Sequence, residues 1–158
     1  MRVSIVTISD SVSSGQREDL SGKALAERCT QLGWEVISKS VIPDDEALIR
    51  AQLLALADSG KIDAALTTGG TGVGPRDVTP EATAAVVTRQ VPGLAELMRH
   101  TGVQKTRKAA LSRAIAGVRG ACLVINLPGS PRGAVESFDA IAELLPHAVA
   151  VLHGARHD

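Results

Sequence analysis

Glycine and threonine are concentrated in one short segment, residues 67–74, which reads Thr-Thr-Gly-Gly-Thr-Gly-Val-Gly. The segment follows the apolar run 62–66, typical of a buried strand, and precedes a helix start at Thr79-Pro80-Glu81. Glycines let a backbone approach an anion closely, and the hydroxyls of the threonines add donors. An ordinary mobile turn is the alternative, but this glycine content at the carboxyl end of a strand favours a phosphate-binding loop. The spacing fits neither a Walker loop nor the G-x-G-x-x-G fingerprint, so P-loop and dinucleotide chemistry are disfavoured.

A cation and a carboxylate, Arg76 and Asp77, follow the glycines at once. Asp77 is suited to Mg²⁺, which prefers one or two carboxylates together with phosphate oxygens of a substrate. A contact between Arg76 and Asp77 within the turn explains the pair equally well. Both interpretations stay open on these residues alone.

A second acidic group, Asp44-Asp45-Glu46, follows the strand predicted over residues 35–42. Carboxylates there can bind a metal or orient a nucleophile. Carboxylates in the first turn of a helix also gain roughly 0.3 to 1 kcal/mol from the helix dipole, which is the favoured interpretation when these residues are considered alone. Asp10 and Asp19 are open to the same two interpretations, as functional carboxylates or as turn and cap residues.

The segment Asn126-Leu127-Pro128-Gly129-Ser130-Pro131 closes another apolar run with a rigid turn. Ser130 is placed to cap a following helix, and capping is the favoured interpretation of this turn. The sequence contains no G-x-S-x-G elbow, so hydrolysis through a serine nucleophile has no support.

Strands and helices alternate along the chain, which predicts right-handed βαβ units and a mainly parallel sheet. The fold class expected is α/β, three-layered, Rossmann-like, with helices on both faces and a small β-hairpin, in a single domain over residues 1–158. The predicted strands are 3–8, 35–42 and 62–66, the hairpin pairs 112–117 with 121–127, and the helices are 20–32, 46–57, 79–89, 94–101 and 133–153. Ligands of such sheets bind at the carboxyl ends of the strands, where the motifs above lie.

Composition excludes several classes of function. Lys plus Arg and Asp plus Glu balance at 17 each, and Trp34 and Phe138 are the only large rings, so nucleic-acid binding is not expected. The apolar start of the chain is too short for a signal peptide or a membrane span, which predicts a cytoplasmic protein with no membrane contact. Cys29 and Cys122 have no partner at zinc-ligand spacing and are expected to be buried free thiols.

Six motifs in order closely resemble the MogA/MoaB family of molybdopterin adenylyltransferases, relatives of the gephyrin G domain. They cover nearly the whole chain and are the segments 8–11 (Ile-Ser-Asp-Ser), 19–22 (Asp-Leu-Ser-Gly), 42–44 (Ile-Pro-Asp), 67–83 from Thr-Thr-Gly-Gly-Thr-Gly to Thr-Pro-Glu-Ala-Thr, 111–113 (Leu-Ser-Arg) and 126–131 (Asn-Leu-Pro-Gly-Ser-Pro).

The resemblance implies attack of the terminal phosphate of molybdopterin on the α-phosphorus of Mg-ATP, giving adenylyl-molybdopterin and pyrophosphate. It implies that Asp44 and Asp77 are the functional, Mg²⁺-binding aspartates. The implied nucleotide-binding residues are Thr68, Gly69, Gly70, Thr71, Gly72, Asn126, Pro128, Gly129 and Ser130. The implied pterin-side residues are Ser9, Asp10, Ser11, Ser112 and Arg113. A homotrimer, doubled to a hexamer in some members, and a MoeA-type molybdenum insertase downstream are implied as well.

Two rival functions remain open. The chain ends soon after its last predicted helix, as in shorter MoaB-like members, some of which bind the cofactor without adenylylating it, so a non-catalytic molybdopterin carrier is the first rival. A nucleotide pyrophosphatase-like relative on the same fold is the second. Retention of both Asp44 and Asp77 favours the adenylyltransferase.

Overall fold

One six-stranded sheet organises the protein, whose computed structural model describes residues 1–155. The strand order is β2-β1-β3-β6-β5-β4. The first four strands in this order run parallel, and β5 and β4 complete the sheet by antiparallel pairing. The strands are β1 (Arg2–Ile8), β2 (Glu35–Ile42), β3 (Ala64–Thr68), β4 (Arg89–Gln90), β5 (Ala116–Arg119) and β6 (Cys122–Leu127).

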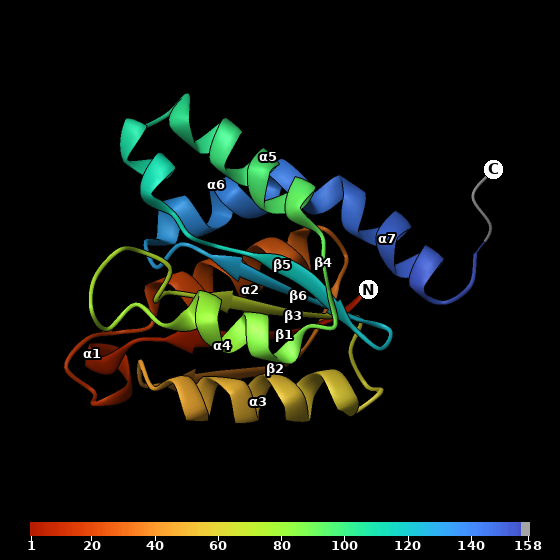
Figure 1. The fold of residues 1–158 in the computed structure, drawn as a ribbon, viewed down its shortest axis with the longest axis horizontal. Helices are drawn as coiled ribbons and strands as arrows, with labels where there is room; N and C mark the ends of the chain where they lie inside the picture. The colour runs from red at the N-terminus through yellow and green to blue at the C-terminus, as the bar shows by residue number, and fades with distance from the viewer. Residues whose placement is uncertain (156–158) are drawn as a thin grey trace.

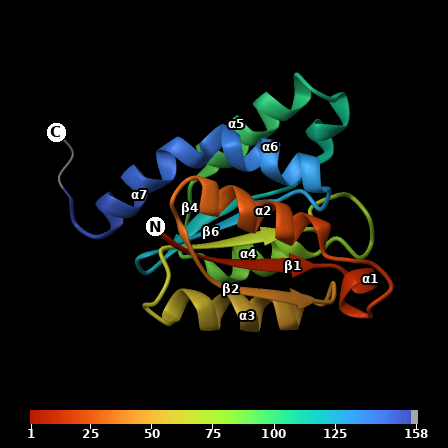
Figure 2. The same cartoon turned by 180° about the vertical axis from the view of Figure 1, so that it is seen from behind.

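Helices cover both faces of this sheet, as Figures 1 and 2 show. One face carries α2 (Leu20–Gln31), α5 (Pro92–Val103), α6 (Pro131–Ile141) and α7 (Leu145–Leu152), and the other carries α3 (Glu46–Asp58) and α4 (Thr79–Val86). Short helical turns complete the chain: α1 (Asp10–Ser13), η1 (Arg107–Leu111) and η2 (Ala142–Leu144). None of the helices in residues 1–155 is long and apolar enough to cross a membrane.

Each face of the sheet has its own apolar core, because successive strand residues point to opposite sides. Along β1, Val3 and Ile5 pack under α2, α5 and α6, whereas Val6 and Ile8 pack against α3 and α4. Phe138 is fully buried in the larger core and meets Trp34 edge to face, with ring centroids 5.4 Å apart. The central strands β3 and β6 are buried along their whole length, as a sheet covered on both faces requires.

The predicted three-layer α/β fold class is confirmed, including the hairpin, which is formed by β5 and β6. The predicted bounds of the two strands that carry the site were wrong in part. The third strand continues through Thr68, so Thr67 and Thr68 belong to β3 and not to the glycine loop that follows it, residues 69–78. The first arm of the hairpin begins at Ala116, after a segment that packs against that loop.

Several helix predictions were also wrong in part. Thr79, at the predicted helix start, is suited by type to cap α4 but is the first residue of that helix, and its hydroxyl donates to Gly69 O. The same helix ends at Val86, short of the predicted Arg89, because β4 pairs with β5 there. The helix predicted over 94–101 is α5, which extends from Pro92 to Val103, and proline is favoured in a first turn. The last predicted helix is divided into α6, η2 and α7.

A buried amide joins the elements that end beneath the glycine loop. Asn126 on β6 is fully buried, and its Nδ2 donates to the hydroxyls of Thr67 (3.1 Å) and Thr83 (2.8 Å). Its Oδ1 accepts from the backbone N–H of Ile115 at 3.2 Å. This one side chain therefore fixes β3, α4 and the start of β5 relative to β6.

We expect Asn126→Ala to lower the free energy of unfolding by at least about 2 kcal/mol, because two buried hydroxyls and the partly buried N–H of Ile115 lose their partner. Urea denaturation followed by circular dichroism measures the loss. Gln31→Ala is the control: it removes an exposed amide from the end of α2, and surface changes of this kind stay within about 0.5 kcal/mol. Equal stabilities for the two variants would contradict the anchoring role of Asn126.

Candidate functional site

The glycine loop, residues 69–78, lies directly on the carboxyl ends of β1 and β6. Gly69 and Gly70 have φ values of +107° and +64°, a region that side-chain-bearing residues avoid. Gly69 N–H donates to Leu127 O at 3.1 Å, and a methyl group on Gly69 would collide with Ile8 O. Glycine is therefore required here for close backbone approach as well as for conformation.

Arg113 holds the same loop from its other side. The backbone N–H of Arg113 donates to Thr71 O at 2.8 Å, and the guanidinium donates to Gly72 O and to Asp77 O, both at 2.6 Å. The guanidinium also pairs with Glu81 of α4, which lowers the pKa of that carboxyl. The donors of Arg113 are therefore engaged inside the protein, and this residue shapes the loop.

Asp77 lies near the end of the glycine loop and lines the two cavities described below. Its Oδ2 accepts from Gly74 N–H at 2.8 Å, while its own N–H donates to Gly74 O at 3.0 Å. Arg76 turns away and pairs with Asp10, so the alternative of a contact between Arg76 and Asp77 within the turn is wrong.

Asp44 lies opposite Asp77, at the carboxyl end of β2 and ahead of α3. Asp45 caps that helix by accepting from Leu48 N–H at 2.9 Å, which leaves Asp44 outside the helix. A methyl group on Gly70 would lie 3.0 Å from Oδ1 of Asp44, so this carboxylate borders the glycine loop. Burial raises the pKa of Asp44, and the charges of Asp10 and Asp77 raise it further, against a hydrogen bond from the amide of Asp10.

Two cavities meet over the glycine loop. The α6-side cavity has a volume of about 440 Å³ and lies between the loop, η1 and the start of α6. The α1-side cavity has about 400 Å³ and lies between the loop, the β1–α1 turn and the start of α2. Both are lined by Gly70, Asp77, Gly129 and Ser130, so two ligands bound in them would meet at these residues.

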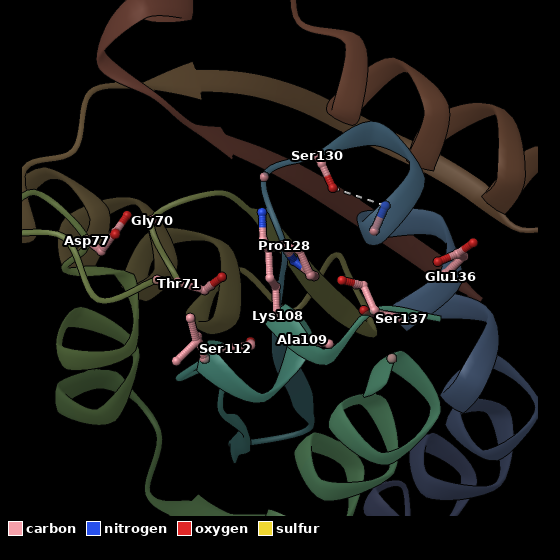
Figure 3. Close-up of a pocket in the computed structure, with 16 residues that line it drawn as sticks. Gly70, Thr71, Asp77, Lys108, Ala109, Ser112, Pro128, Ser130, Glu136 and Ser137 are labelled. Atoms are coloured by element: carbon pink, nitrogen blue, oxygen red, sulfur yellow. Dashed lines mark hydrogen bonds between the residues drawn. The ribbon is translucent and has the colours of Figure 1, made fainter. Parts of the chain in front are cut away.

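The α6-side cavity is mainly lined by small and hydroxyl-bearing residues (Figure 3). Ser130 caps α6 by accepting from Gly133 N–H at 3.1 Å, which confirms the capping interpretation, and it also borders the cavity. Lys108 extends from η1 into this space. The cavity thus combines a helix N-terminus and one ammonium group, which attract anions, with the carboxylates of Asp77 and Glu136.

The structure brings most of the predicted site residues to these two cavities. Those that line one or both of them are Ser9, Asp44, Thr68, Gly69, Gly70, Thr71, Gly72, Asp77, Ser112, Pro128, Gly129 and Ser130. The hydroxyl of Thr68 is engaged with Pro128 O at 2.7 Å. Ser9 caps the short turn α1 by accepting from Val12 N–H.

Four predicted site residues do not line either cavity. Asn126 is fully buried in the network beneath the loop, and Arg113 is engaged with the loop itself. The carboxylate of Asp10 accepts from the guanidinium of Arg76 and from the backbone N–H of Asp44, so it is also occupied by protein donors. Ser11 lies within α1, where its hydroxyl is 3.2 Å from that of Ser9.

Two cationic residues at the cavities were missed by sequence reasoning. Arg17 lines the α1-side cavity, and Lys108 lines the α6-side cavity. Each lies in a polar stretch of the chain, and such a stretch gives no sign of which cationic side chain turns toward a ligand space.

Two carboxylates, but no complete set of metal ligands, face the cavities. Within residues 1–155 no three His, Cys, Asp or Glu side chains are grouped as a complete ligand set. Asp44 and Asp77 face the α1-side cavity from two segments of the chain. A pair of carboxylates that leaves further positions to phosphate oxygens is the arrangement that Mg²⁺ favours, so the residues fit this ion.

Comparison with known proteins agrees with this fold and identifies the family. Residues 4–147 match the family described as a probable molybdopterin binding domain. The chain is 38% identical over 156 residues to the molybdopterin adenylyltransferase of Helicobacter pylori J99, covering 98% of this chain and 89% of that protein. It is also 38% identical to the molybdopterin adenylyltransferase of Escherichia coli K12, over 98% of this chain and 79% of that protein.

A solved structure of a molybdopterin biosynthesis enzyme has the same fold as this chain. The molybdopterin biosynthesis enzyme MoaB of Thermus thermophilus superimposes with a TM-score of 0.91 at 47% identity, over 99% of both chains. The match includes the segments that form the glycine loop and the turns carrying Asp44 and Asp77. The chain therefore belongs to the MogA/MoaB-like family of molybdopterin-binding domains.

Proposed function

We propose that this protein transfers the adenylyl group of ATP to molybdopterin and releases pyrophosphate. The observation that carries the proposal is the pair of cavities that meet at Gly70, Asp77, Gly129 and Ser130, because a transfer between two ligands needs both of them at one point. The names of the Helicobacter pylori and Escherichia coli relatives supply the chemistry.

In the proposed reaction an oxygen of the terminal phosphate of molybdopterin forms a bond to the α-phosphorus of ATP. The bond from the α-phosphorus to the bridging oxygen of the β-phosphate breaks, and the electron pair leaves with pyrophosphate. Such a reaction asks for alignment and charge neutralisation more than for proton transfer. The residues around the shared point are suited to alignment, since the loop backbone is held on both sides.

Asp44 and Asp77 are the residues that would hold Mg²⁺. When bound, the ion supplies positive charge to the phosphate oxygens. The two carboxylates orient that charge toward the point where the cavities meet. Lys108 and the N-terminus of α6 add positive potential on the α6 side.

The remaining site residues are proposed in supporting roles. Gly69, Gly70, Thr71, Gly72, Pro128, Gly129 and Ser130 would contact the nucleotide, with Thr68 and Asn126 supporting the loop. Of the residues that the resemblance places on the pterin side, Ser9 would contact a ligand in the α1-side cavity and Ser112 a ligand in the α6-side cavity, whereas Ser11 lines neither cavity. Asp10 and Arg113 would act through their contacts with other protein residues.

We also propose one domain over residues 1–158, assembly into a homotrimer or a hexamer, and delivery of the product to a MoeA-type molybdenum insertase. The family resemblance supports the assembly and the partner. Light scattering of the purified protein distinguishes the trimer from the hexamer.

A cytoplasmic location is proposed because both cysteines are free and ATP is the co-substrate.

We expect purified protein with Mg-ATP to release pyrophosphate only when molybdopterin is added. Asp77→Asn and Asp44→Asn are each expected to lower kcat at least about 100-fold, because the metal charge is no longer oriented. Asp58→Asn is the control, since Asp58 pairs with Arg119 at the far end of α3. Tight molybdopterin binding without turnover would instead make the protein a carrier, and release without molybdopterin would make it a pyrophosphatase.

The glycine loop gives a second test. Gly70→Ala places a methyl group against the hydroxyl of Thr79 and near Asp44, at a φ of +64°. We expect loss of most adenylyl transfer, measured as pyrophosphate release per folded protein. Gly60→Ala is the matched control: Gly60 has a φ of +68° with open space around it, so it carries a similar conformational cost of about 1 kcal/mol or more without the clash. Comparable activity losses in both variants would contradict a specific role for Gly70.

A further inference from the structure

Asp10 and Asp44 hold each other through a reciprocal pair of hydrogen bonds. Asp10 N–H donates to Oδ2 of Asp44 at 2.9 Å, and Asp44 N–H donates to Oδ1 of Asp10 at 3.0 Å. The two residues follow neighbouring parallel strands, β1 and β2, at the same edge of the sheet. The orientation of the Asp44 carboxylate is therefore coupled to the position of Asp10.

Arg76 adds the glycine loop to this pair. Its Nε and Nη2 each lie 3.0 Å from one carboxylate oxygen of Asp10, a fork that fixes both groups in one plane. Asp77, the other proposed metal carboxylate, is the next residue of the loop. Within the part of the chain that the structure describes, this ion pair is the hydrogen-bonded link from residues 70–78 to the two turns that carry Asp10 and Asp44.

Stability is a poor explanation for the ion pair. The side chains of Arg76 and Asp10 are 66% and 47% exposed, and ion pairs so open to water contribute little to the free energy of unfolding. The fork instead relates two segments that no backbone hydrogen bond joins directly. It also places a guanidinium beside a site that holds the carboxylates of Asp10, Asp44 and Asp77.

We infer that Asp10 and Arg76 are positioning residues that set the separation and orientation of the Asp44 and Asp77 carboxylates, and that Asp10 is not a substrate contact. This inference rests on the proposed function, in which those two carboxylates hold Mg²⁺. Asp10 orients Asp44 directly, and Arg76 holds the segment that carries Asp77 against Asp10. The pair of Arg76 and Asp10 is thus a brace between the two segments that bring Asp44 and Asp77 to the α1-side cavity.

The test compares the wild-type protein with Arg76→Gln, Arg76→Lys, Asp10→Asn and the double variant Arg76→Gln/Asp10→Asn. Arg119→Gln is the matched control, because Arg119 makes the same fork with Asp58, at 2.8 and 3.0 Å, far from the site. Three quantities are measured: kcat and KM for molybdopterin, the Kd of Mn²⁺ in the presence of a non-hydrolysable ATP analogue by electron paramagnetic resonance, and Tm.

We expect Arg76→Gln and Asp10→Asn to lower kcat about tenfold or more, to leave KM for molybdopterin within about twofold, and to weaken Mn²⁺ binding several-fold. The double variant should lose little more than either single variant, because both remove one interaction. Arg76→Lys should restore part of kcat, and Tm should stay within about 3 °C throughout. Arg119→Gln should match the wild type in kcat and in Mn²⁺ binding.

Unchanged kcat and Mn²⁺ binding in Arg76→Gln would overturn the inference while leaving the adenylyltransferase intact. A lowered Tm with normal kcat per folded protein would overturn it too, since the pair would then support folding alone. If the wild type releases no pyrophosphate, the proposed function fails, and Mn²⁺ binding decides the inference separately. If the wild-type protein binds no Mn²⁺ in the presence of the analogue, Asp10 and Arg76 have no ion site to position, and the inference is overturned as well.

Discussion

The direct contact of the glycine loop with two strand ends is the constraint on which the rest of the site depends. A methyl group on Gly69 would collide with Ile8 O, and one on Gly129 would lie 3.2 Å from the Cα of Gly69. The backbone of the loop therefore fills the space where side chains would otherwise cover the edge of the sheet. Both cavities lie over this edge because the glycines of the loop carry no side chains, and the neighbouring turns form the cavity walls.

Polar side chains hold the glycine loop and the strand ends beneath it in place. The amide of Asn126 satisfies two hydroxyls in the interior, where an unpaired polar group is costly, and also the partly buried N–H of Ile115. Arg113 binds two loop carbonyls from the side of β5. A loop rich in glycine would otherwise be mobile, so these two side chains supply the rigidity that alignment of two phosphates requires.

The sequence predicted the layers of the fold and the neighbourhood of the site, but not the partners within it. Hydrophobic periodicity and the alternation of strands and helices are local patterns, and they led to the correct fold class. The fork of Arg76 onto Asp10 joins residues 66 positions apart, and the bonds between Asp10 and Asp44 span 34 positions, so no local pattern could reveal them. The family resemblance implied that Asn126 and Arg113 touch a ligand, whereas burial and hydrogen bonding show them engaged by the protein.

The position of the α1-side cavity follows from the way the chain winds. The connection from β1 to β2 passes through α2 on one face, and the connection from β2 to β3 passes through α3 on the opposite face. The chain therefore turns away from the space between the carboxyl ends of β1 and β3, which is the switch point where sheets of this kind bind ligands. The glycine loop begins after β3, and the turn with Asp10 begins after β1, so the topology alone places them on the two sides of this crevice. The ion pair of Arg76 with Asp10 therefore joins the two sides of this crevice directly.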